Sequence, residues 1–165
     1  MESDMITRKV AMVGHWGVGK TSLVRQFVSQ QFGEKYLATL GVKIDKKVVE
    51  LDDETVNIVL WDIAGSEDDF SVPMHYVKGA AGYLLVVDQT RPDTLLSAKD
   101  LATAIGKEAP DMKCVVALNK SDLDAEISPD DLANAKLADD WFHTSAKTGD
   151  GVEEAFAALA RKLIA

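Results

Sequence analysis

Short apolar runs rich in β-branched residues alternate along the chain with longer stretches in which apolar residues recur at helical spacing. Strands that alternate with helices are typical of a largely parallel sheet covered by helices on both faces. Two runs, 82–87 and 113–118, are continuously apolar apart from Lys113, as expected of strands buried on both sides. The pattern predicts strands at 8–13, 42–51, 55–61, 82–87, 113–118 and 141–143.

Three longer stretches have the pattern of helices. The first begins near Gly19, after a glycine-rich turn, and extends to about Gln31. The second covers about 93–108 and ends before Pro110, because proline cannot continue a helix. The third places apolar residues four, three and four positions apart, on one helix face, at Val152, Phe156, Leu159 and Leu163.

The strands at 42–51 and 55–61 are separated only by the polar turn 52–54, which predicts an antiparallel hairpin. No internal repeat, low-complexity segment or linker interrupts the chain, and 165 residues are an ordinary size for one domain. We therefore expect one α/β domain over residues 1–165, with 1–7 as a flexible N-terminal segment. Its sheet is predicted to be doubly wound, six-stranded and mostly parallel, with one antiparallel edge hairpin and helices on both faces.

Composition and charge exclude several functions. Lysine and arginine total 18 against 27 acids, and the net charge of −9 repels phosphate backbones and anionic lipid, so we expect no nucleic-acid binding. The single cysteine, Cys114, leaves no internal disulfide and no cysteine-based metal site. The sequence shows no secretory signal, no run that could span a bilayer and no C-terminal cysteine to prenylate. We expect a cytoplasmic monomer with no visible lipid anchor.

Residues 14–21, Gly-His-Trp-Gly-Val-Gly-Lys-Thr, match the phosphate-loop pattern G-x-x-x-x-G-K-[ST]. Glycines let the backbone curl until consecutive N–H groups point into one cavity, and the following helix adds the positive end of its dipole. In such a loop Lys20 reaches the β- and γ-phosphates, and the Thr21 hydroxyl is a magnesium ligand. A tight strand-to-helix turn alone would not need Lys20. The motif therefore predicts a site for nucleotide phosphates.

A second motif, Asn119-Lys120-Ser121-Asp122, follows directly on the buried strand at 113–118. Ligands of α/β sheets bind beyond the carboxyl ends of the strands, which is where this motif lies. The Asp122 carboxylate can accept hydrogen bonds from N1–H and the 2-amino group of guanine, whereas adenine would leave the carboxylate unpaired. Any polar loop could produce this tetrapeptide, so its value comes from its coincidence with the phosphate loop.

With three further motifs, the chain resembles the Ras-superfamily small GTPases, particularly their Rab and Ran branches. Residues 36–42 resemble the first switch, 61–65 (Trp-Asp-Ile-Ala-Gly) the second switch, and 144–147 (Thr-Ser-Ala-Lys) the last guanine loop. The resemblance extends from Lys9 to the last helix, with all five motifs in the family's order. It implies the fold of P-loop NTPases and binding of GTP and GDP with Mg²⁺. Taken singly, each of the three later motifs could be an ordinary loop or helix cap.

The resemblance also gives roles to single residues. It implies that Thr39 contacts magnesium and the γ-phosphate, that Asp62 holds magnesium through water, and that the Gly65 N–H senses the γ-phosphate. The expected metal ligands are Thr21, Thr39 and Asp62. The residues expected to act in catalysis are Lys20, Thr39, Gly65 and Ser66. The residues expected to bind the nucleotide are Gly14, Trp16, Gly17, Val18, Gly19, Lys20, Thr21, Ser22, Phe32, Thr39, Asn119, Lys120, Asp122, Ser145, Ala146 and Lys147.

The chain departs from the family at two positions that matter for hydrolysis. In Ras and Gα a glutamine orients the attacking water, and this chain has Ser66 at that position. Serine is too short for this role, so we expect slow hydrolysis unless Glu67 or a partner's residue substitutes. Trp16 stands where many relatives have a small residue. Its indole is expected either to occupy the path of an arginine finger or to shield the triphosphate from water. The neighbouring His15 is a weaker candidate for a general base.

The sequence favours a molecular switch that hydrolyses GTP slowly and binds effector, exchange and activating proteins through Tyr36–Val42 and Asp62–Tyr76. The rival hypothesis is a non-hydrolysing GTP-binding scaffold, in which Ser66 and Trp16 mark lost catalysis. The retained magnesium and γ-phosphate residues disfavour it, because a scaffold has no need of them. A P-loop small-molecule kinase is also disfavoured, because no acceptor site is recognisable and Asp122 selects guanine.

Overall fold

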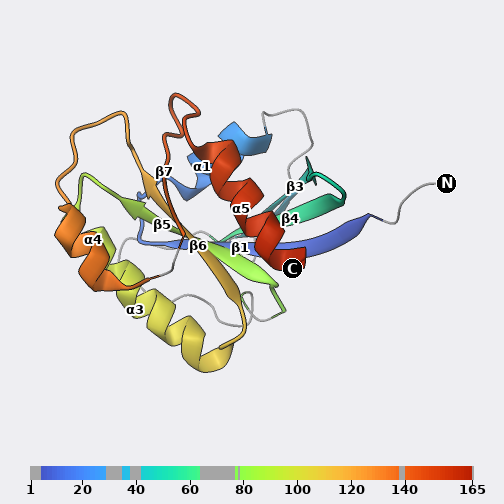
Figure 1. The fold of residues 1–165 in the computed structure, drawn as a ribbon, viewed down its shortest axis with the longest axis horizontal. Coiled ribbons are helices and arrows are strands. Elements are labelled where there is room, and N and C mark those ends of the chain that lie inside the picture. The colour runs from blue at the N-terminus through green and yellow to red at the C-terminus, as the bar shows by residue number, and fades with distance from the viewer. Residues whose placement is uncertain are drawn as a thin grey trace.

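A seven-stranded sheet forms the centre of the computed structural model (Figure 1). The strands stand in the order β2-β3-β4-β1-β5-β6-β7, with β2, β3 and β4 antiparallel and the other neighbours parallel. The structure describes residues 5–28, 35–37, 42–63, 77, 79–137 and 140–164. The strands are β1 (Ile6–Gly14), β2 (Lys35–Leu37), β3 (Val42–Glu50), β4 (Thr55–Ile63), β5 (Gly82–Asp88), β6 (Lys113–Asn119) and β7 (Trp141–His143).

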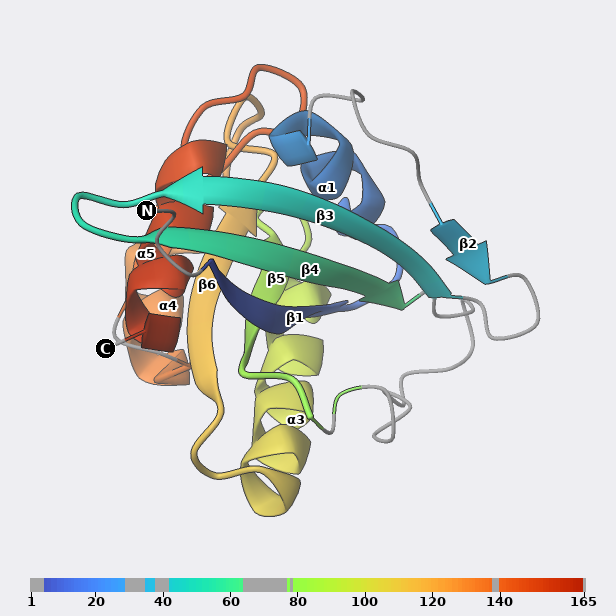
Figure 2. The same cartoon turned by 90° about the vertical axis from the view of Figure 1, so that its right-hand side faces the viewer.

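Helices cover both faces of this sheet. α1 and α5 pack against one face, and α3 with α4 packs against the other (Figures 1 and 2). Since successive side chains of a strand point to opposite faces, Val10 and Met12 enter the first core while Ala11 and Val13 enter the second. In the described part of the chain the helices are α1 (Lys20–Val28), α3 (Pro92–Glu108), α4 (Pro129–Ala135) and α5 (Val152–Ile164).

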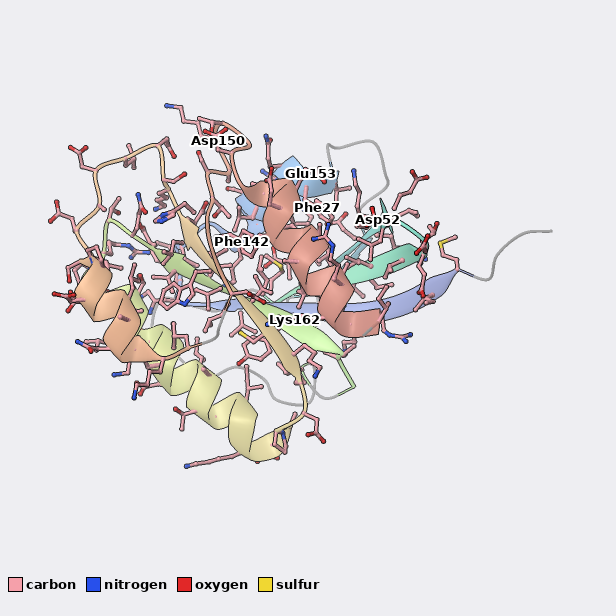
Figure 3. The ribbon with its side chains drawn as sticks, viewed as in Figure 1. Phe27, Asp52, Phe142, Asp150, Glu153 and Lys162 are labelled. Atoms are coloured by element: carbon pink, nitrogen blue, oxygen red, sulfur yellow. The ribbon has the colours of Figure 1, made fainter. Side chains whose placement is uncertain are left out.

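A stacked aromatic pair fixes α1 against α5. The rings of Phe27 and Phe156 are parallel to within 6°, with centroids 3.9 Å apart, and both side chains are almost fully buried. Figure 3 shows Phe27 and Phe142 beside α5. Aromatic side chains bury large apolar areas, and such pairs add further stabilisation. Because α1 begins at Lys20 of the phosphate loop, this packing also fixes the position of the loop.

The order of the strands reverses beside β1. From β1 the chain forms β2, β3 and β4 on one side, with β3 and β4 as a long hairpin (Figure 2), and then β5, β6 and β7 on the other. Gly14, at the carboxyl end of β1, pairs with Val86 of β5. Open α/β sheets bind ligands at such a switch point, beyond the carboxyl ends of the strands. The fold therefore places the residues after Gly14 and after Asp88 at its binding edge.

The predicted doubly wound α/β fold is confirmed, with its six strands, its antiparallel hairpin and helices on both faces. β2 is an additional three-residue strand that pairs with β3, so β2 forms the edge of the sheet in place of the predicted hairpin. Ile6 and Thr7, expected in a flexible segment, pair with β4 instead. Part of the first predicted helix, beyond Val28, lies outside the described residues.

Helix α4 was not predicted. None of its seven residues is buried. A helix that buries no face does not need the apolar stripe by which helices are recognised in a sequence. Its start is fixed locally instead, because the Ser128 hydroxyl accepts a hydrogen bond from the Asp131 N–H and Pro129 occupies the first turn. In the described ranges, no helix combines the length and the apolar character needed to cross a bilayer.

Candidate nucleotide-binding site

The turn between β1 and α1 has a backbone that only glycine adopts readily. Gly17 and Gly19 have φ values of 78° and 102°, in the region that side chains with a Cβ disfavour. A Cβ on Gly19 would also lie 2.3 Å from the Asn119 Nδ2 atom. The two glycines therefore let the loop curl tightly against the end of β6.

Asn119 joins this loop to the loop that follows β7. Its side chain is almost fully buried, and its Nδ2 donates to the Val18 carbonyl at 2.9 Å. Its Oδ1 accepts hydrogen bonds from the Thr144 hydroxyl at 3.2 Å and from the Ala146 N–H at 3.3 Å. A buried amide with all these partners satisfied fixes three segments of the chain relative to one another.

Asp122 is oriented from the same loop. The Ser145 hydroxyl, which is fully buried, donates to Asp122 Oδ1 at 2.7 Å. Ser145 Oγ in turn accepts the Thr148 N–H at 3.1 Å. The carboxylate borders a cavity of about 310 Å³ next to the phosphate loop. Its lining residues are Gly19, Ser22, Asn119, Lys120, Asp122, Leu123, Ala146 and Lys147.

Lys120 adopts a positive φ of 69°, which is uncommon for a residue with a side chain. Its Nζ donates to the Gly17 carbonyl at 3.2 Å and lies 2.7 Å from the Oδ2 of Asp88. Asp88 ends β5 and is fully buried. A strained backbone of this kind persists where contacts hold the residue in place. Here the Gly17 carbonyl and the Asp88 carboxylate hold the Lys120 side chain at the phosphate loop.

The Thr21 hydroxyl, at the start of α1, meets the Asp62 carboxylate of β4. The Thr21 hydroxyl donates to Asp62 Oδ2 at 2.5 Å, and Asp62 is 4% exposed. Its other oxygen, Oδ1, is buried and has no hydrogen-bond partner within the described part of the chain. A buried carboxylate oxygen without a partner is costly, and a hydroxyl with a carboxylate suits the oxygen preference of Mg²⁺. These residues therefore fit a magnesium ion.

Lys20, the first residue of α1, places a positive charge at the phosphate loop. Its ammonium donates to the Gly14 carbonyl at 2.9 Å. Burial lowers the pKa of Lys20, and the nearby charge of Asp62 opposes that shift. A cation that is partly desolvated next to backbone N–H groups is suited to an anion with several negative charges.

Most residues of the predicted site come together around this loop. Trp16 is 48% exposed. His15 Nδ1 lies 3.0 Å from the Ser97 hydroxyl of α3. Four predicted residues, Phe32, Thr39, Gly65 and Ser66, lie outside the residues that the structure describes. Those brought together are Gly14, Trp16, Gly17, Val18, Gly19, Lys20, Thr21, Ser22, Asp62, Asn119, Lys120, Asp122, Ser145, Ala146 and Lys147.

Three residues at the site were not predicted from the sequence. Asp88 binds Lys120, and Arg91 donates to the Trp16 carbonyl at 3.0 Å. The available signal was position alone, because Asp88 ends a continuously apolar strand beside the phosphate loop. Leu123, which lines the cavity, has no motif either.

Comparison with known proteins agrees with this arrangement. The sequence model of the Ras family matches residues 9–165. The chain is 37% identical over 161 residues to Ras-related protein Rab-4B of Rattus norvegicus and of Homo sapiens, covering 94% of this chain and 76% of each relative. It is 34% identical over 161 residues to Ras-related protein Rab-4A of Danio rerio, with the same coverage.

The fold and its phosphate loop are those of the Ras-like P-loop GTPases. The chain belongs to the Ras family, in which it is a Rab-like small GTPase. It is thus a member of a class of GTP-binding molecular switches, and the predicted resemblance is confirmed. Small GTPases of this kind bind GTP and GDP with Mg²⁺ and interact with effectors, exchange factors and activating proteins.

Proposed function

We propose that this chain binds GTP and GDP together with Mg²⁺ at the site described, and that it hydrolyses GTP slowly. The observation that carries the proposal is the position of Asn119. Its hydrogen bonds to the Val18 carbonyl, the Thr144 hydroxyl and the Ala146 N–H hold the phosphate loop and the cavity beside Asp122 together. A single nucleotide would contact both the phosphate loop, through its phosphates, and the cavity beside Asp122, through its base.

Selection of guanine is supported by the orientation of Asp122. Ser145 donates to Oδ1, which fixes the plane of the carboxylate at the edge of the cavity. A fixed carboxylate matches the paired N–H donors of guanine, and it disfavours adenine, which offers no such pair of donors to the carboxylate.

Binding of Mg²⁺ is supported by Asp62 Oδ1, which has no hydrogen-bond partner among the described residues, and by the adjacent Thr21 hydroxyl. We propose that these two residues hold the ion together with Thr39. The ion, when bound, neutralises phosphate charge. Lys20 supplies a further positive charge from the loop itself.

The proposal of slow hydrolysis rests on Ser66, because serine is shorter than the glutamine that usually orients the attacking water. The exposed indole of Trp16 stands at the edge of the phosphate loop. We propose that the Trp16 indole restricts the approach of an arginine from an activating protein. Faster hydrolysis of GTP would then require an activating protein whose surface accommodates this indole. The switch segments Tyr36–Val42 and Asp62–Tyr76 are proposed to bind effectors and regulators.

The direct test is single-turnover hydrolysis of GTP with Mg²⁺, in wild type and in Ser66→Gln. We expect slow turnover in wild type and an increase of about tenfold or more in the variant, because glutamine can orient the water. Lys99→Gln, which introduces a glutamine at an exposed position of α3 outside the site, serves as the control and should leave the rate unchanged. Rapid turnover in wild type would contradict the proposal. Binding without turnover in either protein would favour the non-hydrolysing scaffold.

A further inference from the structure

Asp88 is a fully buried carboxylate at the switch point of the sheet, and hydrogen bonds satisfy both of its oxygens. Oδ1 accepts the Thr90 N–H at 2.9 Å and the Thr90 hydroxyl at 2.6 Å. Oδ2 accepts Arg91 Nε at 3.0 Å and Lys120 Nζ at 2.7 Å. Burial alone would raise the pKa of Asp88, but the hydrogen bonds from Lys120, Thr90 and Arg91 outweigh it and lower the pKa to about 2. Asp88 is therefore charged at neutral pH.

Both cations bound to Asp88 also reach the phosphate loop. Arg91 Nη2 donates to the Trp16 carbonyl at 3.0 Å, and Lys120 Nζ donates to the Gly17 carbonyl at 3.2 Å. The guanidinium packs closely here, since a Cβ added to Gly17 would lie 3.2 Å from Arg91 Nη2. One buried carboxylate thus holds two cations against two successive carbonyls of the loop.

The contact at Trp16 fixes the direction of a phosphate-loop donor. In a planar trans peptide the carbonyl and the N–H point in opposite directions. A Trp16 carbonyl held toward Arg91 therefore turns the Gly17 N–H away from Arg91. Gly17 has a φ of 78°, and a glycine at this position can rotate its peptide easily when nothing holds it. Arg91 removes that freedom before any ligand arrives.

We infer that Asp88 and Arg91 are positioning residues for nucleotide phosphates, which hold the Trp16–Gly17 peptide in the orientation that presents the Gly17 N–H to a β-phosphate. This rests on the proposed function of the site. Donors oriented in advance increase affinity, because binding no longer has to order them. The same bond fixes the backbone from which the Trp16 indole projects, and so ties this bulky side chain to the start of α3.

The test compares the affinities of GDP and GMP for Arg91→Gln and wild type, by displacement of a fluorescent GDP. GMP lacks the β-phosphate, so we expect the variant to lose about tenfold in GDP affinity and to keep its GMP affinity. Arg91→Lys, which has one nitrogen in place of the two that bind Asp88 and Trp16, should lose less. Lys99→Gln removes an exposed cation from the same helix and should match wild type.

Two results would overturn the inference. An unchanged GDP affinity in Arg91→Gln would mean that the contact of Arg91 with the Trp16 carbonyl does not contribute to nucleotide binding. An equal loss of affinity for GDP and GMP would mean that Arg91 acts on the base cavity or on the fold. Thermal unfolding of the nucleotide-free variants distinguishes the two, because only an effect on the fold lowers the melting temperature. If Arg91→Gln does not fold, the Arg91→Lys ratio of GDP to GMP affinity decides. Wild type that binds no guanine nucleotide would instead overturn the proposed function itself.

Discussion

The two ends of the nucleotide site are held together by different forces. At the base end, neutral groups are buried and hydrogen-bonded, chiefly Asn119, Thr144 and Ser145. At the phosphate end, buried carboxylates of Asp62 and Asp88 stand near cations. Neutral hydrogen bonds fix shape and depend little on salt or pH, whereas charges respond to both. On the proposed function, the hydrogen bonds of the base end hold Asp122 for selection of guanine, and the charges of the phosphate end compensate the phosphates.

The largest effect is expected where the two ends meet. Asn119→Ala would leave the Val18 carbonyl, the Thr144 hydroxyl and the Ala146 N–H without their buried partner. Each unsatisfied group costs about 1–3 kcal/mol, so we expect GDP affinity to fall about a hundredfold or more and the melting temperature to fall as well. Isothermal titration and thermal unfolding measure the two effects. Asn134→Ala, at an exposed position of α4, is the matched control.

A smaller effect, confined to the base end, is expected for Asp122→Asn. The amide cannot accept both guanine N–H donors, so GDP affinity should fall about tenfold or more while the affinity for xanthosine diphosphate rises. Competition between the two nucleotides measures this preference. The neighbouring exposed Asp124→Asn should change neither affinity. An unaltered preference in Asp122→Asn would mean that the cavity does not select guanine through this carboxylate.

The charged groups of the phosphate end should make the free energy of unfolding depend on pH. Because the pKa of Asp88 is lowered to about 2 from an ordinary 3.8, its charge stabilises the fold fully above about pH 4. That contribution is lost as the pH falls through about 2. The difference in free energy of unfolding between wild type and Asp88→Asn should therefore be constant from pH 8 to 5 and shrink below pH 4. Urea unfolding at each pH measures it. A difference that grows on acidification would contradict the assignment.

Much of the fold could be predicted because local patterns agree with the tertiary structure. Continuously apolar β5 and the four-three-four spacing in α5 both correspond to buried residues. Helix α4 could not be predicted, since it buries none of its residues. The phosphate loop and the Asn119–Asp122 motif were recognisable because their chemistry demands particular residues at fixed spacing.

The ion cluster around Asp88 was not recognisable for the opposite reason. Arg91 and Trp16 are 75 positions apart in sequence, and no spacing rule connects them. Only the sheet order, which brings the end of β5 beside the end of β1, creates that contact. The roles given to the site residues stay predictions, and Phe32, Thr39, Gly65 and Ser66 also lie outside the described ranges.

The most direct test of the account is displacement of fluorescent GDP from the wild-type protein by GDP, GMP and ADP, with Mg²⁺ present. If one end selects guanine and the other binds phosphate by charge, GDP should displace the probe best, GMP much more weakly and ADP not detectably. Displacement by ADP as effective as that by GDP would contradict the guanine site. GMP as effective as GDP would contradict the role given to the phosphate loop and its ions.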